Sequence, residues 1–156
     1  MKIALYIAFQ NKSSIDCCKE IIDLISENNQ LIIDSKVKND LDESKRDNFI
    51  FFDSNEQIDS DIDFVFAIGG DGTILRSITY VKDSNIPILG INTGRLGFLT
   101  SVQKEGISNA LSHINNKKFS IIERTILKVN SGNNDTVNYP YALNEINIQR
   151  KDTTSL

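Results

Sequence analysis

The chain has 156 residues, a length that favours one domain or one domain joined to part of another. Hydrophobic residues make up 40% and charged residues 24%, which is ordinary for a globular protein and enough to build a core. The formal net charge of −4 comes without a basic stripe, which argues against a nucleic-acid-binding protein.

The apolar segments of the sequence are short. None approaches the roughly 18 residues that a membrane span needs, and the N-terminal KIALYIAF meets the polar QNKSS too soon for a signal peptide. We therefore expect a cytoplasmic protein without a membrane partner. The adjacent Cys17 and Cys18 belong to no spaced set of metal ligands and are interpreted as small apolar residues on a helix.

The first part of the chain predicts strands that alternate with helices. Lys2–Phe9 is an apolar run typical of a strand buried on both faces. A helix follows from Ser13, which forms a pattern like a capping box with Asp16. Residues 31–34 and 49–52 predict two more strands, and the polar segment between them fits either a loop or an exposed helix.

The same alternation continues through the middle of the sequence. Strands are predicted at 63–68 and 86–94, and amphipathic helices at about 73–82 and 105–116. Strands that alternate with helices imply βαβ units and a parallel sheet. We therefore predict an α/β nucleotide-binding domain over residues 1–118.

The pattern changes after Lys118. Two extended segments flank Gly132–Asp135, and alternation is clearest in ALNEINIQR, which predicts a β-hairpin. We interpret residues 119–156 as the start of an antiparallel, β-rich second domain. A two-stranded ribbon is marginal by itself, so we expect the sequence to be truncated inside this domain.

A glycine turn joins the strand at 63–68 to the next helix, in the stretch FVFAIGGDGTILRSITY. Glycine lets a ligand approach the backbone closely, and a helix N-terminus stabilises anions. In an open α/β sheet, ligands bind beyond the carboxyl ends of the strands. The turn matches neither the dinucleotide fingerprint G-x-G-x-x-G nor the P-loop.

Asp71 brings a carboxylate to this turn, where phosphate is expected. Two chemical roles fit: a base that accepts the proton of an attacking hydroxyl, or a ligand of Mg²⁺ that bridges phosphates. The structural alternative is a cap on the following helix. Arg76, one turn further along, faces either phosphate or solvent.

Two further segments carry candidate binding residues. The loop GINTGRLGFLT at 90–100 offers polar groups at a strand end, among them Asn92, and an apolar Phe98 that fits either a nucleobase wall or the core. Asn144 and Glu145, at the start of a predicted strand, are suitable partners for ribose hydroxyls, or else exposed strand residues.

Taken together, these three motifs resemble the NAD kinase family. That family carries the Gly-Gly-Asp-Gly-Thr turn, here Gly69–Thr73, then a loop like GINTGRLGFLT and an Asn-Glu pair like that of ALNEINIQR, in this order and spacing. The turn also occurs in diacylglycerol-type lipid kinases and relatives of phosphofructokinase, whereas the three motifs together are specific. The resemblance runs over nearly the whole chain.

The resemblance implies transfer of a phosphoryl group from ATP, or a related donor, to the 2′-hydroxyl of the adenosine ribose of NAD, giving NADP. It implies that Asp71 is the base that activates the hydroxyl. It further implies a divalent cation, with Mg²⁺ expected, and a homo-oligomer. The implied binding residues are Gly70, Gly72 and Thr73 around the phosphates, Leu75 and Phe98 beside adenine, Asn144 and Glu145 on NAD, and Arg76 as a lesser phosphate contact.

One departure from the family is length. Its members are roughly twice as long, and a later Gly-Ser-Thr-Ala-Tyr segment that completes the nucleotide site is absent here. We therefore expect little kinase activity from the 156-residue chain alone. The alternatives are a lipid kinase of the diacylglycerol type, which should show a wider apolar substrate surface, and a nucleotide-binding module without catalysis.

Overall fold

The computed structural model describes residues 1–25, 29–95, 97–130 and 140–148. The chain divides into two compact units, Met1–Ile122 and Glu123–Leu156, and each is described by itself. Of the helices in the described ranges, none has both the length and the apolar character to cross a membrane.

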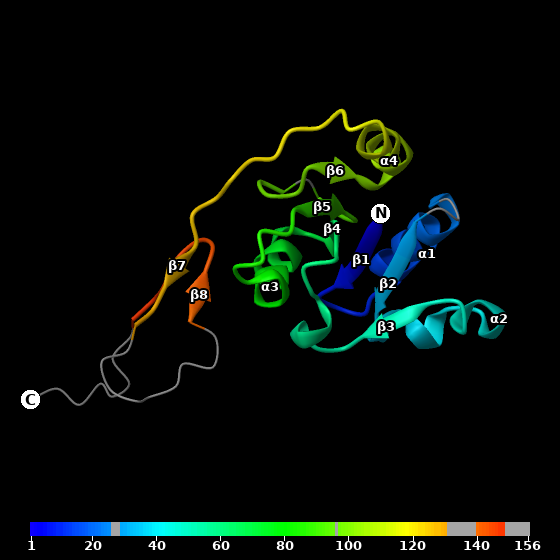
Figure 1. Ribbon diagram of the computed structural model, residues 1–156, viewed down its shortest axis with the longest axis horizontal. Coiled ribbons are helices and arrows are strands. Elements are labelled where there is room, and N and C mark those ends of the chain that lie inside the picture. The colour runs from blue at the N-terminus through cyan, green and yellow to red at the C-terminus, as the bar shows by residue number, and fades with distance from the viewer. Residues whose placement is uncertain (26–28, 96, 131–139, 149–156) are drawn as a thin grey trace, which may run out of the picture. The chain divides into compact units, whose positions relative to one another are not determined.

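The first unit is built around a parallel sheet, which has six strands within the described residues (Figure 1). The strand order is β3-β2-β1-β4-β5-β6, and each neighbouring pair is parallel. This confirms the predicted α/β fold. The strands are β1 (Lys2–Ile7), β2 (Gln30–Asp34), β3 (Ile50–Phe52), β4 (Phe64–Gly69), β5 (Ile88–Asn92) and β6 (Val102–Gln103).

Helices cover both faces of this sheet. Alternate side chains of β1 enter different buried clusters: Ile3, Leu5 and Ile7 in one, Ala4 and Tyr6 in the other. Helices α1 (Lys12–Leu24) and α4 (Ile107–Asn115) contribute to the first cluster, and α3 (Asp71–Val81) contributes to the second. The sheet is therefore the middle layer of three, as its doubly apolar strands predict.

The two cysteines lie in the core, as their interpretation as apolar helix residues predicts. Cys17 and Cys18 are fully buried on α1 and form no disulfide. Burial raises the pKa of each thiol to about 12, because the thiolate would lose its hydration. They are packing residues of the first cluster.

Two helix starts differ from the sequence-based prediction. The N-cap of α1 is Asn11, whose side chain accepts a hydrogen bond from the Ser14 N–H at 3.0 Å, so the predicted capping box at Ser13 is wrong. Helix α3 begins at Asp71, two residues earlier than predicted, with Gly70 as its N-cap. This start places the Asp71 carboxylate in the first turn of the helix.

The segment between β2 and β3 is helical in two short pieces. A 3₁₀ helix covers Ser35–Asp40, and α2 covers Glu43–Arg46. The Arg46 side chain donates to the Leu41 carbonyl at 2.9 Å and ties the two pieces together. Shorter 3₁₀ turns lie at Asn55–Gln57 and Lys104–Gly106.

The second unit contains an antiparallel pair of strands within its described part. Strands β7 (Leu127–Lys128) and β8 (Tyr141–Ala142) pair with Leu127 opposite Ala142. The antiparallel pairing is as predicted, but the predicted turn at Gly132–Asp135 lies outside the described residues. The strand predicted from Asn144 is wrong as far as residue 148, because no strand is formed there.

Candidate functional site

The strand order defines a switch point between β1 and β4. From β1 the chain moves outward to β2 and β3, then returns to the other side of β1 with β4 and β5. Ile7 of β1 lies beside Ile68 of β4, so the loops that follow these two strands start next to each other. In open α/β sheets the crevice beyond such strand ends is where ligands bind.

The glycine turn after β4 lies at this switch point. Gly69 has φ +154°, and a Cβ there would collide with the Thr73 side chain, so the turn requires glycine at this position. Thr73 is buried beneath the turn. Gly70 and Gly72, by contrast, are exposed and have open space where a side chain would be, which leaves their backbone accessible to a ligand.

Asp71 is held by the loop that follows β5. Its Oδ2 accepts a hydrogen bond from the Phe98 N–H at 2.7 Å, and its Oδ1 accepts from the N–H groups of Leu99 at 2.9 Å and Thr100 at 3.2 Å. These hydrogen bonds stabilise the carboxylate and lower the pKa of Asp71. The alternative that Asp71 caps α3 is wrong, because the N-cap is Gly70 and the Asp71 carboxylate accepts from the loop after β5.

Gly97 allows this close approach of loop and carboxylate. A Cβ at position 97 would lie 2.6 Å from Asp71 Cγ and even closer to Oδ1. The neighbouring Phe98 is 99% exposed, so its alternative placement in the core is wrong for this structure. Its ring is free to meet a ligand beside Asp71.

Asn92 shapes the start of the same loop. It is 1% exposed, donates from Nδ2 to the Arg95 carbonyl at 2.6 Å and accepts at Oδ1 from the Gly94 N–H at 2.9 Å. Both ends of its amide are therefore used within the loop. Its predicted role in substrate binding stays a prediction.

The loop after β1 forms another side of the crevice, and the sequence analysis missed it. The guanidinium of the exposed Arg76 lies over the Phe9 ring, 4.9 Å from its centre, and Phe9 is itself 58% exposed. Ser13 Oγ donates to the Thr93 carbonyl at 2.8 Å, which ties α1 to the loop after β5. The available signal was an aromatic residue at the carboxyl end of the predicted strand Lys2–Phe9, of which the structure forms only Lys2–Ile7 as β1. Leu75, next to Arg76 on α3, is half-buried.

Asn144 and Glu145 belong to the second unit. Both are exposed and follow β8. Their predicted role in binding NAD stays a prediction.

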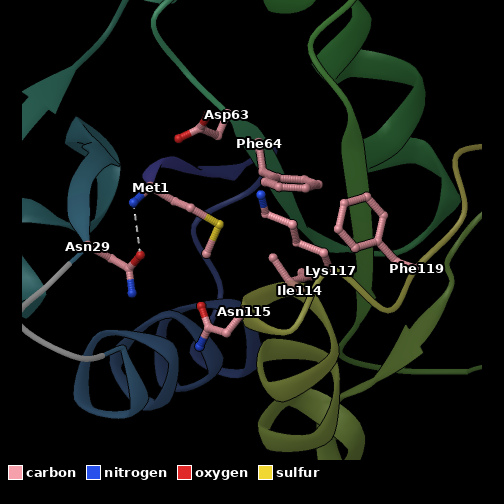
Figure 2. Close-up of a pocket in the computed structure, with 8 residues that line it drawn as sticks. All are labelled: Met1, Asn29, Asp63, Phe64, Ile114, Asn115, Lys117 and Phe119. Carbon is pink, nitrogen blue, oxygen red and sulfur yellow. Dashed lines mark hydrogen bonds between the residues drawn. The ribbon is translucent and has the colours of Figure 1, made fainter.

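A cavity lies at the opposite edge of the sheet, where β1 and β4 begin (Figure 2). It has a volume of about 600 Å³, and the rings of Phe64 and Phe119 meet in it edge to face with centres 5.5 Å apart. Because the chemistry-bearing turn lies at the carboxyl ends of the strands, we assign the site there and not to this cavity. The residues lining the cavity are Met1, Asn29, Asp63, Phe64, Ile114, Asn115, Lys117 and Phe119.

The described residues do not form a metal site by themselves. No group of three or more histidine, cysteine, aspartate or glutamate side chains converges among them. The Asp71 carboxylate is the acidic group of the turn, and it accepts hydrogen bonds from three backbone N–H groups. These residues therefore do not fit a cation held by protein alone.

Comparisons with known proteins identify the family of the chain. A family model described as the ATP-NAD kinase N-terminal domain matches residues 9–119. An NAD kinase of Christiangramia forsetii is 39% identical over 162 residues, and one of Flavobacterium johnsoniae is 38% identical over 161 residues; each match covers 100% of this chain and 55% of the relative. The chain thus spans about half the length of the curated relatives it matches.

The fold is similar to that of a solved structure, a yeast NADH kinase in complex with NADH. The TM-score is 0.68 at 19% sequence identity, and the match covers 82% of this chain and 41% of the yeast chain. At this identity the likeness concerns the fold alone.

Proposed function

This chain belongs to the ATP-NAD kinase family, and we propose that it forms the part of an NAD kinase that carries the catalytic base. The reaction transfers a phosphoryl group from ATP, or a related donor, to the 2′-hydroxyl of the adenosine ribose of NAD and yields NADP. The observation that carries the proposal is the Asp71 carboxylate at the β1–β4 switch point, between the accessible Gly70 and Gly72 and the exposed Phe98.

Asp71 acts as the general base in this proposal. It accepts the proton of the 2′-hydroxyl as the ribose oxygen forms its bond to the γ-phosphorus. The bond between that phosphorus and the bridging β–γ oxygen breaks, and ADP leaves when ATP is the donor. Gly70 and Gly72 give the phosphates room against the backbone at the start of α3, where negative charge is stabilised.

The remaining predicted residues are assigned to substrate binding in this proposal. Phe98 and Leu75 border adenine. Thr73 is buried beneath the turn and supports it, and the turn itself faces the phosphates. Arg76 is suited to a phosphate contact because its guanidinium is exposed beside the turn. Asn144 and Glu145 bind the ribose hydroxyls of NAD, and Asn92 contributes by holding the loop.

Several finer features are proposed for the complete enzyme. A divalent cation enters bound to the substrate phosphates, as Mg²⁺ commonly does. Homo-oligomeric assembly, which the resemblance implies, and a cytoplasmic location are part of this proposal. Small-molecule nucleotides are its partners.

A chimera provides a direct test of the base. Residues 1–156 replace the matching part of the Christiangramia forsetii relative, and NADP formation is followed with an NADP-specific dehydrogenase. We expect activity in the chimera and a loss of about a hundredfold or more in kcat for Asp71→Asn, with NAD binding retained. The control is Asp83→Asn, which removes an exposed carboxylate just beyond α3.

The outcomes separate the alternatives. Unchanged turnover in Asp71→Asn contradicts the base role. An inactive chimera that still binds NAD favours a nucleotide-binding module, and phosphorylation of diacylglycerol in place of NAD favours the lipid kinase.

A further inference from the structure

The hydrogen bonds to Asp71 make its carboxylate a weaker base, because they lower its pKa. Its carboxylate accepts from consecutive N–H groups of Phe98, Leu99 and Thr100, which favour the charged form over the protonated one. A general base works best when its pKa lies near the ambient pH. A carboxylate freed from these N–H groups would therefore be a stronger base.

The three consecutive N–H groups all donate to one anionic group, the Asp71 carboxylate. Consecutive backbone N–H groups that converge on one acceptor also bind phosphate oxygens in proteins. The Asp71 carboxylate occupies this position at 2.7 to 3.2 Å. In the described chain, Thr100 Oγ1 is buried and has no hydrogen-bond partner, so the same segment carries a further donor that no protein group uses.

The surroundings leave room for an exchange of anions. The Phe98 ring is exposed, and Gly70 lies next to open space. A phosphate and a carboxylate both carry negative charge, so they do not share these N–H groups.

We propose that the N–H groups of Phe98, Leu99 and Thr100 form a phosphate-binding nest, which Asp71 occupies until a nucleotide phosphate displaces its carboxylate. Binding of the nucleotide then frees the base to accept a proton. This inference deepens the proposed function and rests on it.

Nuclear magnetic resonance on the 156-residue chain tests the exchange without measuring turnover. Pyrophosphate, ATP and NAD are added separately while the amides of Phe98, Leu99 and Thr100 and the side-chain carboxyl of Asp71 are followed across pH. We expect saturable shifts of these amides, together with a rise in the pKa of Asp71 toward its ordinary value. A response to pyrophosphate alone shows that phosphate chemistry suffices, and a response to only ATP or only NAD identifies which nucleotide supplies the phosphate.

Two results would overturn the nest. One is the absence of saturable amide shifts with all three probes. The other is a shift of the amides while the pKa of Asp71 stays depressed, since the carboxylate would then not have been released.

Substitutions give an independent test. A side chain at position 97 meets the carboxylate, so Gly97→Ala should raise the pKa of Asp71 in the free protein, whereas Gly94→Ala, which has open space, should leave it unchanged. Asp71→Asn removes the charged occupant and should lower the Kd of pyrophosphate about fivefold. Asp83→Asn, with the same change in net charge, should not, and equal effects of the two variants count against the nest.

The nest and the proposed function fail in different ways. If the chimera makes NADP and Asp71→Asn stops it while the amides do not respond, the nest is wrong and the kinase assignment stands. If the amides and the carboxyl respond but the chimera makes no NADP, the nest stands and the assignment fails.

Discussion

At the scale of single residues, the hydrogen bonds to Asp71 couple stability to pH. They lower its pKa in the folded chain, so the carboxylate contributes stability above its unfolded pKa, and this contribution is lost as the pH falls through the folded value. We expect the unfolding free energy of the wild-type chain to exceed that of Asp71→Asn by a constant amount from about pH 5 to 7, and the difference to shrink below about pH 4. Urea titrations at each pH measure it, and a difference that persists unchanged to about pH 2 would contradict the hydrogen-bonded geometry.

The motifs around Asp71 could be predicted from the sequence, but the contacts between them could not. The turn, its carboxylate and the following loop were predicted as parts of one site, because glycines after buried strands have a defined chemical meaning. The contact between Asp71 and the N–H groups of Leu99 and Thr100 was not, because it depends on how two loops meet in space. The need for glycine at position 97 can be explained only once the contact with the Asp71 carboxylate is known.

At the scale of elements, the start of α1 is set by one side chain. Asn11 accepts from the Ser14 N–H and satisfies a donor that the helix leaves free. Asn11→Ala should lower the unfolding free energy by about 1 kcal/mol and speed amide exchange in the first turn of α1. Lys12→Ala, at the exposed next position, is the matched control. An equal loss in both variants would refute the capping role.

The elements that the sequence predicts well are those with a buried face. Strands β1 and β4 are buried on both sides and appear as continuous apolar runs, and α4 repeats Ile107, Leu111 and Ile114 at helical spacing. Strand β6 has only two residues, and its pairing with Ile91 and Asn92 of β5 leaves no periodic pattern to find. The alternation after Asn144 misled, because the described residues 144–148 do not form a strand.

At the scale of the whole molecule, the buried clusters belong to the first unit. Their members all lie at or before Ile114, whereas Ile121 and Ile122 are exposed. A chain of residues 1–122 should therefore unfold within about 0.5 kcal/mol of the 156-residue chain, as expected for a unit that contains these buried clusters. Urea titration followed by circular dichroism checks this.

A substitution in the core shows how large a loss of unfolding free energy the comparison of the two chain lengths can detect. Ile3→Ala empties a fully buried position and should cost about 2–5 kcal/mol in either length of chain. If the shorter chain instead loses stability on the scale of Ile3→Ala, residues 123–156 take part in the core and the division into units is wrong.

The exposed ring of Phe98 also makes the site visible to spectroscopy. The sequence contains no tryptophan, so Phe98→Trp would place a single indole at a position where the native ring is 99% exposed. Adenine that stacks on this indole should quench its emission, and the quenching would report occupancy in real time. Position 98, where the native aromatic ring is exposed to water, is thus also a position from which nucleotide binding can be timed by fluorescence.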